Sequence, residues 1–416
     1  MQKILILTVT AGNCHNACAQ SMKRELETRG GGQTEVKIVD LLKSYSTKRN
    51  VWVADKGYSF AAGKLLPIYN AFYDRYRKAN PNKRYACPPQ KTVLSTLDGL
   101  LWEIFHFQPD VIYCTHFYAA IALTDLKLVY FLPCKIIAST FDYVNSPFWE
   151  AGIGVDFLTL PNEDLVDSYL ALGYRREQIL TCGIPVDGRT LVPFDKAEAR
   201  KKLSLAQEPF TVLVMYGGGH WGGGYQIFHT VAKALKGREA QIIMINGRNK
   251  RSFRKVERVK KKCGVRVLNL GFTKEIPLCL AGADLIVNKC GGGGCSEVLN
   301  MGLPMLVPQR LPAQEGYNLS YLRKKGVALS FRGKRQLKEQ LKNIMDNPKR
   351  LQEMSRNTLP LKKNAVGDLA DFILAQPNAD YSGYLEMMLL YGDDFRAKRA
   401  VKRALKRADK RSRRGE

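Results

Sequence analysis

The sequence has no apolar run near the roughly 18 residues that a membrane-spanning helix needs. Its longest apolar stretch, 126–138, is interrupted by Lys127, Pro133 and Lys135. The N-terminal segment is apolar only over 4–9 and lacks the basic flank of a secretory signal. These absences predict a protein that neither spans a membrane nor is exported.

Acidic residues are scarce relative to basic ones. The 416 residues include 65 Lys and Arg but only 38 Asp and Glu, which gives a formal net charge of +27. Such a surplus indicates an acidic partner, and nucleic acid, an anionic membrane and a phosphorylated small molecule all fit. Because 45% of the residues are hydrophobic, the chain can form full cores, and its length predicts two or three domains.

The ten cysteines do not form the dense framework of a small secreted protein. They are scattered along the chain, for example at Cys87, Cys182 and Cys263. We therefore expect reduced thiols and a cytoplasmic location.

The order of strands and helices repeats along the chain. Residues 3–8 form an apolar run, 16–29 have helical periodicity, and 35–39 alternate as a strand. The same order returns at 211–215, after the Pro- and Gly-containing connection 183–209. We predict an α/β protein of two similar halves, with a ligand at the carboxyl ends of the parallel strands in the cleft between them. The predicted partition is 1–185, 186–375 and a C-terminal helical segment with a basic tail, 376–416.

The first of three glycine sites is the turn 10–16, between a predicted strand and a helix. Such a turn lets backbone N–H groups and the helix dipole meet an anion or a polar ligand. His15 stands beside the helix start, where it is either a general base or a solvated helix cap.

The second glycine site, 217–222, satisfies G-x-G-x-x-G between a strand and a helix. A dinucleotide fold would place an acidic residue about 20 residues further on, at the end of the next strand. Strand 241–245 is followed instead by Asn-Gly-Arg, so an NAD site is disfavoured and an NADP site using Arg248 is weakened but stays open. A phosphate cradle is predicted in either case, from Gly217, Gly218 and Gly219.

The third glycine site is the most informative. Four successive glycines permit close backbone approach to a pyrophosphate, and Glu297 in the next helical turn can accept hydrogen bonds from a ribose diol. The plainer interpretation is that Glu297 complements the helix dipole. These glycines are Gly291, Gly292, Gly293 and Gly294.

Polar residues that can read sugar hydroxyls follow shortly after. Gln314, Glu315 and Asn318 offer both donors and acceptors, although they could instead cap the following helix.

In this order the motifs resemble those of the GT-B glycosyltransferases, which have two Rossmann-like doubly wound domains facing each other across a cleft. More narrowly, the chain is similar to the diacylglycerol glycosyltransferases and monogalactosyldiacylglycerol synthase-like enzymes of glycosyltransferase family 28. The most specific matching motifs are Gly271-Phe272, Ala283-Asp284, 289–297, Gly302-Leu303-Pro304 and 312–318.

The resemblance implies a role for each matching donor residue. Phe272 would lie near the uracil of a UDP-sugar, and Glu297 would bind the ribose. The two later glycine segments would face the pyrophosphate, and Ser296 would belong to the donor site. Gln314 and Glu315 would bind the hexose, with Asn318 completing the donor site.

The resemblance also implies an inverting reaction with no metal and no cofactor beyond the UDP-sugar. His15 and Asp142 are the two candidate bases for the acceptor hydroxyl, and helix dipoles would stabilise the departing diphosphate. The chain departs from the family pattern in three ways. Cys14 replaces a glycine, which leaves close backbone approach there an open question. A His is missing after Asp142, and Gly294 stands where many relatives carry Thr.

Aromatic and basic residues alternate between Tyr45 and Tyr85, a composition suited to a lipid headgroup interface, to stacking on single-stranded nucleic acid, or to a core helix with a basic face. The resemblance favours lipid. The basic tail 396–416 is either an amphipathic helix on an anionic surface or a solvated segment. The predicted acceptor and membrane residues are Trp52, Tyr58, Phe60, Tyr69, Arg75 and Arg77.

The sequence therefore predicts an inverting glycosyltransferase that moves glucose or galactose from a UDP-sugar to diacylglycerol at the cytoplasmic membrane face. The nearest alternative transfers N-acetylglucosamine to a polyprenyl-diphosphate-linked cell-wall precursor. A basic nucleic-acid-binding protein is the alternative from another class, and an NADP oxidoreductase comes last.

Overall fold

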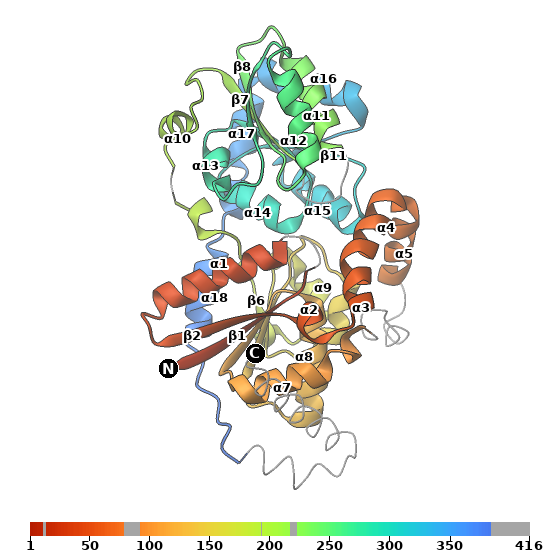
Figure 1. Cartoon of the computed structure of the whole chain (residues 1–416), viewed down its shortest axis with the longest axis vertical. Coiled ribbons are helices and arrows are strands. Elements are labelled where there is room, and N and C mark those ends of the chain that lie inside the picture. The colour runs from red at the N-terminus through yellow and green to blue at the C-terminus, as the bar shows by residue number, and fades with distance from the viewer. Residues whose placement is uncertain (11–13, 79–91, 193, 217–222, 384–416) are drawn as a thin grey trace.

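The computed structural model describes residues 1–10, 14–78, 92–192, 194–216 and 223–383. Two parallel six-stranded sheets form the two halves of the chain, one below the other in Figure 1. The first has the order β2-β1-β3-β4-β5-β6, and the second has the order β12-β11-β10-β7-β8-β9. The strands are β1 (Gln2–Thr8), β2 (Thr34–Asp40), β3 (Val111–Cys114), β4 (Lys135–Ser139), β5 (Phe157–Thr159), β6 (Ile179–Leu180), β7 (Phe210–Met215), β8 (Ala240–Ile245), β9 (Arg266–Leu270), β10 (Leu285–Asn288), β11 (Met305–Pro308) and β12 (Ala328–Phe331).

The strands form from short apolar runs because helices cover both faces of each sheet. All four residues from Ile4 to Leu7 are completely buried, as are the central residues of β7 and β10. The helices that matter for the site begin directly after these strands. The principal helices are α1 (Cys14–Arg29), α2 (Leu41–Tyr45), α3 (Lys48–Trp52), α4 (Tyr58–Lys64), α5 (Leu66–Lys78), α7 (Leu97–Phe107), α8 (Phe117–Tyr130), α9 (Val166–Leu170), α10 (Lys196–Lys202), α11 (Gly224–Leu235), α12 (Lys250–Lys260), α13 (Ile276–Ala281), α14 (Gly292–Asn300), α15 (Ala313–Lys324), α16 (Gly333–Asp346), α17 (Pro348–Arg356) and α18 (Ala365–Leu374).

Each sheet has one point where the strand order reverses. In the first sheet this point lies between β1 and β3, and in the second it lies between β7 and β10. Ligands of open α/β sheets bind outside the carboxyl ends of the strands at such a point. Helices α1 and α14 begin at these two places, and Figure 1 shows α14 and α15 between the sheets, next to α1.

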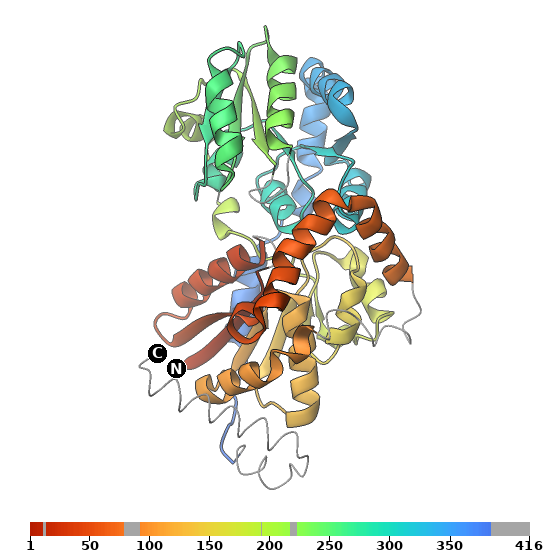
Figure 2. The same cartoon turned by 45° about the vertical axis from the view of Figure 1, so that its right-hand side comes forward.

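A helical arm extends from the side of the first sheet. We call residues 48–78 the arm; it consists of α3, the π-helical turn Val53–Gly57, α4 and α5. Figure 2 shows it rising from the first half to α15 of the second. Its contacts with α15 are direct, for example from Tyr317 Oη to Asp74 Oδ1 at 2.8 Å. The arm therefore connects the two halves at one side of the cleft.

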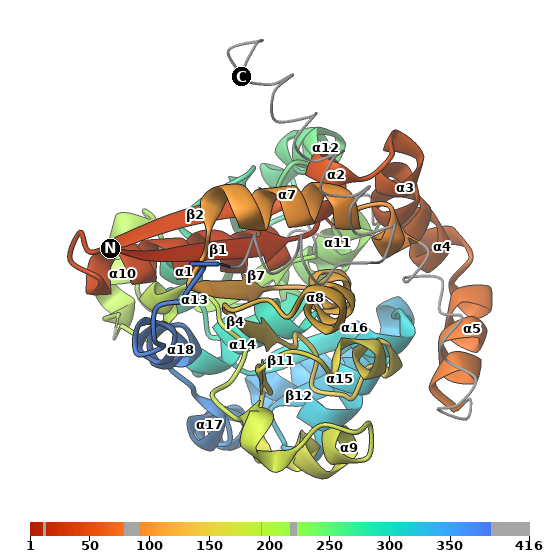
Figure 3. The ribbon, with the colours of Figure 1, turned by 90° about the horizontal axis from the view of Figure 1, so that it is seen from below.

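The chain returns to the first half at its other side. Helix α18 packs against α1, and Arg29 Nη1 donates to both carboxylate oxygens of Asp371 at 2.8 Å. Figure 3 shows α18 beside α1, below the strands of the first sheet. The partition into 1–185, 186–375 and 376–416 stays a prediction. Among the described residues, no helix is both long and apolar enough to cross a membrane.

Candidate active site

The loop between β1 and α1 brings His15 to the carboxyl edge of the first sheet. Thr8 Oγ1 donates to Asn16 Oδ1 at 2.9 Å, and Asn16 Nδ2 donates to Thr10 Oγ1 at 3.1 Å. These bonds tie the first turn of α1 to the end of β1. The glycine of this loop, Gly12, lies outside the described residues.

His15 has a defined tautomer. Its Nδ1 lies 2.5 Å from the backbone oxygen of Thr115, which can only accept, so Nδ1 carries the hydrogen and Nε2 keeps its lone pair. The ring packs edge-on against His116 and Phe141, with centroids 4.6 and 4.8 Å apart. Burial lowers the pKa of His15 to about 4, although the Thr115 carbonyl opposes this shift. His15 is therefore neutral at pH 7 and can accept a proton.

His116 is a supporting residue that the sequence reasoning missed. It is buried, and its Nδ1 accepts a hydrogen bond from the backbone N–H of Tyr118, which caps α8. Burial, followed by the proximity of His15, lowers the pKa of His116. A second neutral ring thus packs against the candidate base. The signal that could have found it is its place two residues after a buried strand, at the carboxyl edge of the first sheet.

Asp142 follows β4 and faces the second half. Its Oδ1 accepts a hydrogen bond from Asn318 Nδ2 at 2.8 Å, and burial raises its pKa while this bond lowers it. Asn318 is completely buried and also bonds the backbone of Tyr143 at 2.7 Å and of Cys290 at 2.9 Å. It could reach a donor sugar only by breaking these bonds. Its contacts make it a positioning residue for Asp142.

The four glycines of the third site begin α14 and fall into two pairs. A Cβ on Gly292 would overlap the backbone oxygen of Phe141, and a Cβ on Gly293 would overlap Cys14 Sγ. These two glycines are therefore needed for close packing of the two halves. By contrast, among the described residues Gly294 has no atom within 4 Å of a Cβ position, and Gly291 has only Glu315 Oε1 at 3.9 Å. The outer pair borders open space at the positive end of a helix, where an anion is stabilised.

Ser296 also serves the contact between halves. Its Oγ donates to Gly292 O at 3.1 Å and lies 2.7 Å from the Tyr143 hydroxyl, and the side chain is buried. The Tyr143 ring stacks on Tyr321 of α15 at 5.1 Å. A contact of Ser296 with the donor, as predicted, would thus compete with two existing bonds.

Glu297 projects from α14 toward the segment that connects the halves. Its carboxylate accepts no hydrogen bond from the described residues. Burial raises its pKa to about 7; the Asp187 charge raises it further and Arg189 opposes the shift. A carboxylate with these acceptor positions unoccupied can accept hydrogen bonds from the two hydroxyls of a ribose.

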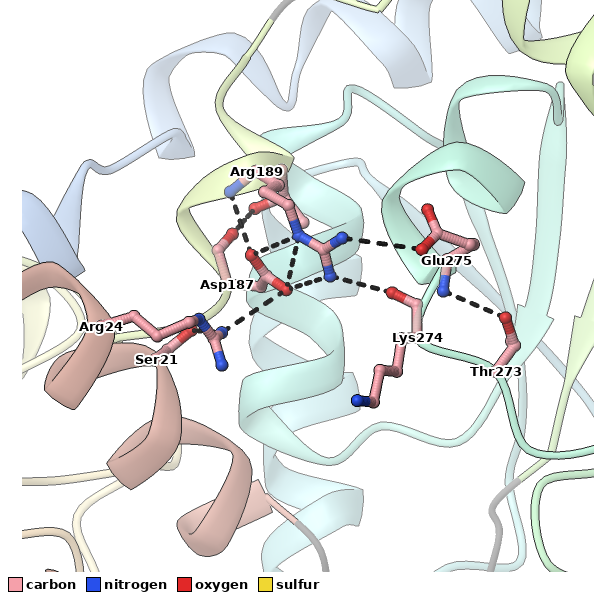
Figure 4. A network of polar contacts seen from close by, with 8 residues as sticks. Ser21, Arg24, Asp187, Arg189, Thr273, Lys274 and Glu275 are labelled. Atoms are coloured by element: carbon pink, nitrogen blue, oxygen red, sulfur yellow. Dashed lines mark hydrogen bonds and ion pairs between the residues drawn. The ribbon is translucent and has the colours of Figure 1, made fainter.

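The charges near Glu297 belong to a network that joins α1, the connecting segment and the loop before α13. Figure 4 shows Arg189 paired with Asp187, with Nη2 to Oδ2 at 2.8 Å, and bonded to Lys274 O at 2.8 Å. Arg24 of α1 lies 4.0 Å from Asp187, and Glu275 lies 3.9 Å from Arg189 on the other side.

Glu315 and Lys289 form a mostly buried ion pair beside the glycines. Their charged atoms are 3.8 Å apart, and their side chains are 13% and 14% exposed. Burial raises the pKa of Glu315 and lowers that of Lys289, although each charge opposes the shift of the other. Glu315 Oε2 is buried and has no hydrogen-bond partner in the part of the chain that the structure describes. Such an orphaned acceptor fits a sugar hydroxyl.

Gln314 is bound by two tyrosines of the arm. Tyr69 Oη donates to Gln314 Oε1 at 3.0 Å, and Gln314 Nε2 donates to Tyr58 Oη at 2.7 Å. Two residues predicted for the acceptor side thus contact a residue predicted for the donor sugar.

Two family models match complementary parts of the chain. The model for monogalactosyldiacylglycerol (MGDG) synthase matches residues 15–186, and the model for the glycosyltransferase family 28 C-terminal domain matches residues 225–372. The chain is a glycosyltransferase. The predicted resemblance and enzyme class are confirmed.

Individual relatives agree with this assignment. The chain is similar to a probable monogalactosyldiacylglycerol synthase from Glycine max, at 24% identity over 87% of this chain and 69% of the relative. It is similar to a processive diacylglycerol beta-glucosyltransferase from Staphylococcus saprophyticus, at 25% identity over 86% of this chain and 88% of the relative. The crystal structure of MurG from Acinetobacter baumannii shares its fold, with a TM-score of 0.59 and 14% identity over 90% of this chain and 99% of MurG. The predicted GT-B fold is confirmed.

Phe272 of the glycosyltransferase lies just after the carboxyl end of β9. It is 65% exposed, and the Arg248 guanidinium lies 5.3 Å from its ring centroid. A flat, exposed ring beside a cation suits stacking on a nucleobase. Gly217, Gly218 and Gly219 of the predicted phosphate cradle lie outside the described residues.

The six residues predicted to meet the acceptor or the membrane divide between two sides of the arm. Trp52 and Phe60 are 61% and 52% exposed, and Arg75 is also exposed. Tyr58 and Tyr69 are turned toward Gln314, and Arg77 lies over the Tyr317 ring at 4.2 Å. Only the first group is available to a surface outside the molecule.

Proposed function

We propose that the glycosyltransferase moves a hexose from a UDP-sugar to the hydroxyl of diacylglycerol, with inversion at the anomeric carbon, at the surface of an anionic membrane. The names of both relatives support a lipid acceptor. The observation that carries the proposed chemistry is the neutral His15, with Nε2 free, next to the glycine-rich start of α14.

The reaction needs a base on one side of the sugar and an anion site on the other. In the proposal, His15 Nε2 removes the acceptor proton while the hydroxyl oxygen attacks the anomeric carbon and the bond to UDP breaks. Asp142 is the second candidate base, but a raised pKa and the Asn318 bond suit it better to orienting the acceptor. The start of α14 stabilises the negative charge that develops on the leaving diphosphate.

The donor sits on the second half in this proposal. Phe272 stacks on uracil, and Glu297 binds the ribose. Gly291 and Gly294 border the pyrophosphate. The unpartnered Oε2 of Glu315 accepts a hydrogen bond from a hexose hydroxyl. The predicted absence of a metal is part of the proposal, because the helix dipole supplies the positive potential.

The outer side of the arm is proposed to dock on the membrane. It exposes Trp52, Phe60, Ile68 and Phe72 at 61%, 52%, 67% and 51%, next to the exposed Arg75. Large apolar side chains with neighbouring cations bind an anionic lipid interface. We place the enzyme at the cytoplasmic face, where UDP-sugars are available.

The test is an activity assay with defined acceptors. Purified full-length protein is incubated with UDP-glucose, UDP-galactose or UDP-N-acetylglucosamine and diacylglycerol in anionic vesicles. We expect a hexosyl-diacylglycerol whose anomeric configuration is opposite to that of the donor, measured by NMR. Unchanged diacylglycerol with every donor would overturn the proposal. Transfer only to a polyprenyl diphosphate acceptor would select the alternative enzyme.

Membrane docking is tested separately by vesicle sedimentation. We expect replacement of Trp52 and Phe60 by Ser to weaken binding to anionic vesicles at least tenfold, because each large side chain contributes about 1.5–3 kcal/mol when buried. Leu359→Ser is the matched control, since Leu359 is 59% exposed on the second half. Equal binding by all three proteins would remove the arm from the membrane interface.

A further inference from the structure

The side of the arm that faces inward presents two tyrosine hydroxyls to one glutamine. Gln314 Oε1 accepts from Tyr69 at 3.0 Å, and Gln314 Nε2 donates to Tyr58 at 2.7 Å. Each of these bonds occupies one donor or acceptor position of the amide. One N–H and one lone pair of the amide remain for another molecule.

Other contacts fix the arm on either side of Gln314. Asn70 Nδ2 donates to Leu311 O at 3.1 Å, and Tyr317 Oη donates to Asp74 Oδ1 at 2.8 Å. Gln314 and Tyr317 are three residues apart on α15 and therefore face the same side of its start, and Leu311 lies just before this helix. These two bonds hold the arm in place beside α15. They therefore also hold Tyr58 and Tyr69, independently of the bonds that these tyrosines make to Gln314.

The amide lies where a donor sugar would need it. The neighbouring Glu315 reaches the glycine run, with Oε1 3.9 Å from a Cβ position on Gly291, and its Oε2 has no partner. The Tyr58 hydroxyl, which bonds the Gln314 amide, lies near the same carboxylate: burial, then Tyr69 and then the charge of Glu315 raise the pKa of Tyr58. Gln314 is therefore held between the arm and the surroundings of Glu315. A glutamine side chain has three rotatable bonds, so anchoring it in advance reduces the entropy lost on sugar binding.

We propose that Tyr58 and Tyr69 are positioning residues of the donor site, which act through Gln314 to fix its amide for hexose recognition. The proposal rests on the proposed function and on the role that the resemblance implies for Gln314, which is to bind the hexose beside Glu315. Glucose and galactose differ only in the orientation of one hydroxyl, and a fixed amide distinguishes such epimers better than a mobile one. The arm thereby links the acceptor side of the molecule to selectivity for the donor.

The variants Tyr58→Phe and Tyr69→Phe test this role, because they remove one hydroxyl and keep the ring. Tyr73→Phe is the matched control: Tyr73 lies on the same arm, its ring centroid is 6.3 Å from that of Tyr69, and among the described residues the Gln314 side chain bonds Tyr58 and Tyr69 and not the Tyr73 hydroxyl. Thermal unfolding of each variant shows whether the fold is kept.

The main readout is calorimetric binding of UDP, UDP-glucose and UDP-galactose without acceptor, so it does not depend on lipid transfer. We expect each tyrosine variant to weaken binding of the preferred UDP-hexose about 3- to 10-fold and to reduce the preference between the two hexoses. UDP alone should bind as to the wild type, and Tyr73→Phe should change nothing.

A double-mutant cycle identifies the route of the effect. In a Gln314→Ala background, Tyr58→Phe should cause no further loss of UDP-hexose affinity, because the group it positions is gone. Additive losses, or equal weakening of UDP and UDP-hexose, would overturn the positioning role. If Gln314→Ala weakens UDP-hexose binding while both tyrosine variants bind normally, only this inference fails. If Gln314→Ala binds UDP-hexose normally, the proposed hexose role of Gln314 fails with it.

Discussion

The candidate bases of the first half and the candidate donor carboxylates of the second half differ in how completely their polar groups are satisfied, and we call these two sets of residues the two walls of the cleft. In the wall from the first half, His15 bonds Thr115 O and Asp142 accepts from Asn318, so both groups are held before any substrate binds. In the wall from the second half, Glu315 Oε2 is buried without a partner, and Glu297 accepts no hydrogen bond from the described residues. The comparison teaches that the wall with the candidate bases is preorganised, whereas the wall with the donor residues keeps open acceptors for a ligand.

The largest expected effect comes from removing the candidate base. His15→Ala should lower kcat by about 10²–10⁴-fold and leave UDP binding unchanged, because the imidazole acts only on the acceptor proton. Steady-state kinetics and calorimetry measure the two quantities. His229→Ala is the control, since His229 is exposed on α11 of the second half. A large loss of UDP affinity in His15→Ala would contradict the prediction, because it would mean that His15 also contributes to donor binding.

The two pairs of glycines should separate packing from ligand binding. Gly292→Ala should reduce the free energy of unfolding by about 1–3 kcal/mol, because its Cβ would overlap the Phe141 carbonyl. Gly294→Ala meets no atom and should leave stability unchanged or raise it by about 0.5–1 kcal/mol, while weakening UDP binding at the open side. Denaturant unfolding and calorimetry distinguish the two. Equal stability of both variants would contradict the close contact between the walls.

Binding of UDP to the second half should depend on pH through Glu297. Its pKa is raised to about 7, so the carboxyl is protonated below that pH and becomes a stronger acceptor above it. We expect UDP affinity to rise about 3- to 10-fold from pH 6 to pH 8 beyond the change seen in Glu297→Gln. The phosphates of UDP titrate equally with both proteins and cancel in this difference. Parallel pH profiles for the two proteins would exclude ionised Glu297 as a ligand for ribose.

The smallest expected effect concerns the charges between the halves. Arg24 lies 4.0 Å from Asp187, and its side chain is 60% exposed. Arg24→Ala should therefore change the free energy of unfolding by less than about 1 kcal/mol. A larger loss in denaturant unfolding would show that surface charges, rather than the glycine contacts and Asn318, hold the two walls together.

Local signals in the sequence predicted much of the fold. The apolar runs predicted 3–8 and 211–215, and the strands found are Gln2–Thr8 and Phe210–Met215. Strands buried on both faces must be apolar throughout, so their positions can be read without knowing their neighbours. Glycine turns at strand ends likewise marked the two places where the strand order reverses.

Contacts between the halves could not be predicted in this way. Asn318 meets Asp142 across 176 positions, and Gln314 meets Tyr58 across 256. No local pattern encodes such pairs, because each residue alone is compatible with a capping or a solvent-exposed position. The contact between Cys14 and Gly293 is another case: cysteine replaces the usual glycine where the opposite helix has no side chain.

The sequence by itself determined the two α/β halves, the glycine-rich strand ends and the residues that can carry acid, base and hydroxyl chemistry. These depend on apolar periodicity and on side-chain chemistry, which are properties of short segments. Only the tertiary structure decided which residues are free to act. Burial sets the protonation of His15 and Glu297, and long-range hydrogen bonds commit Asn318 and Ser296 to holding the halves together. Burial and bonding of this kind arise only when distant segments pack against one another.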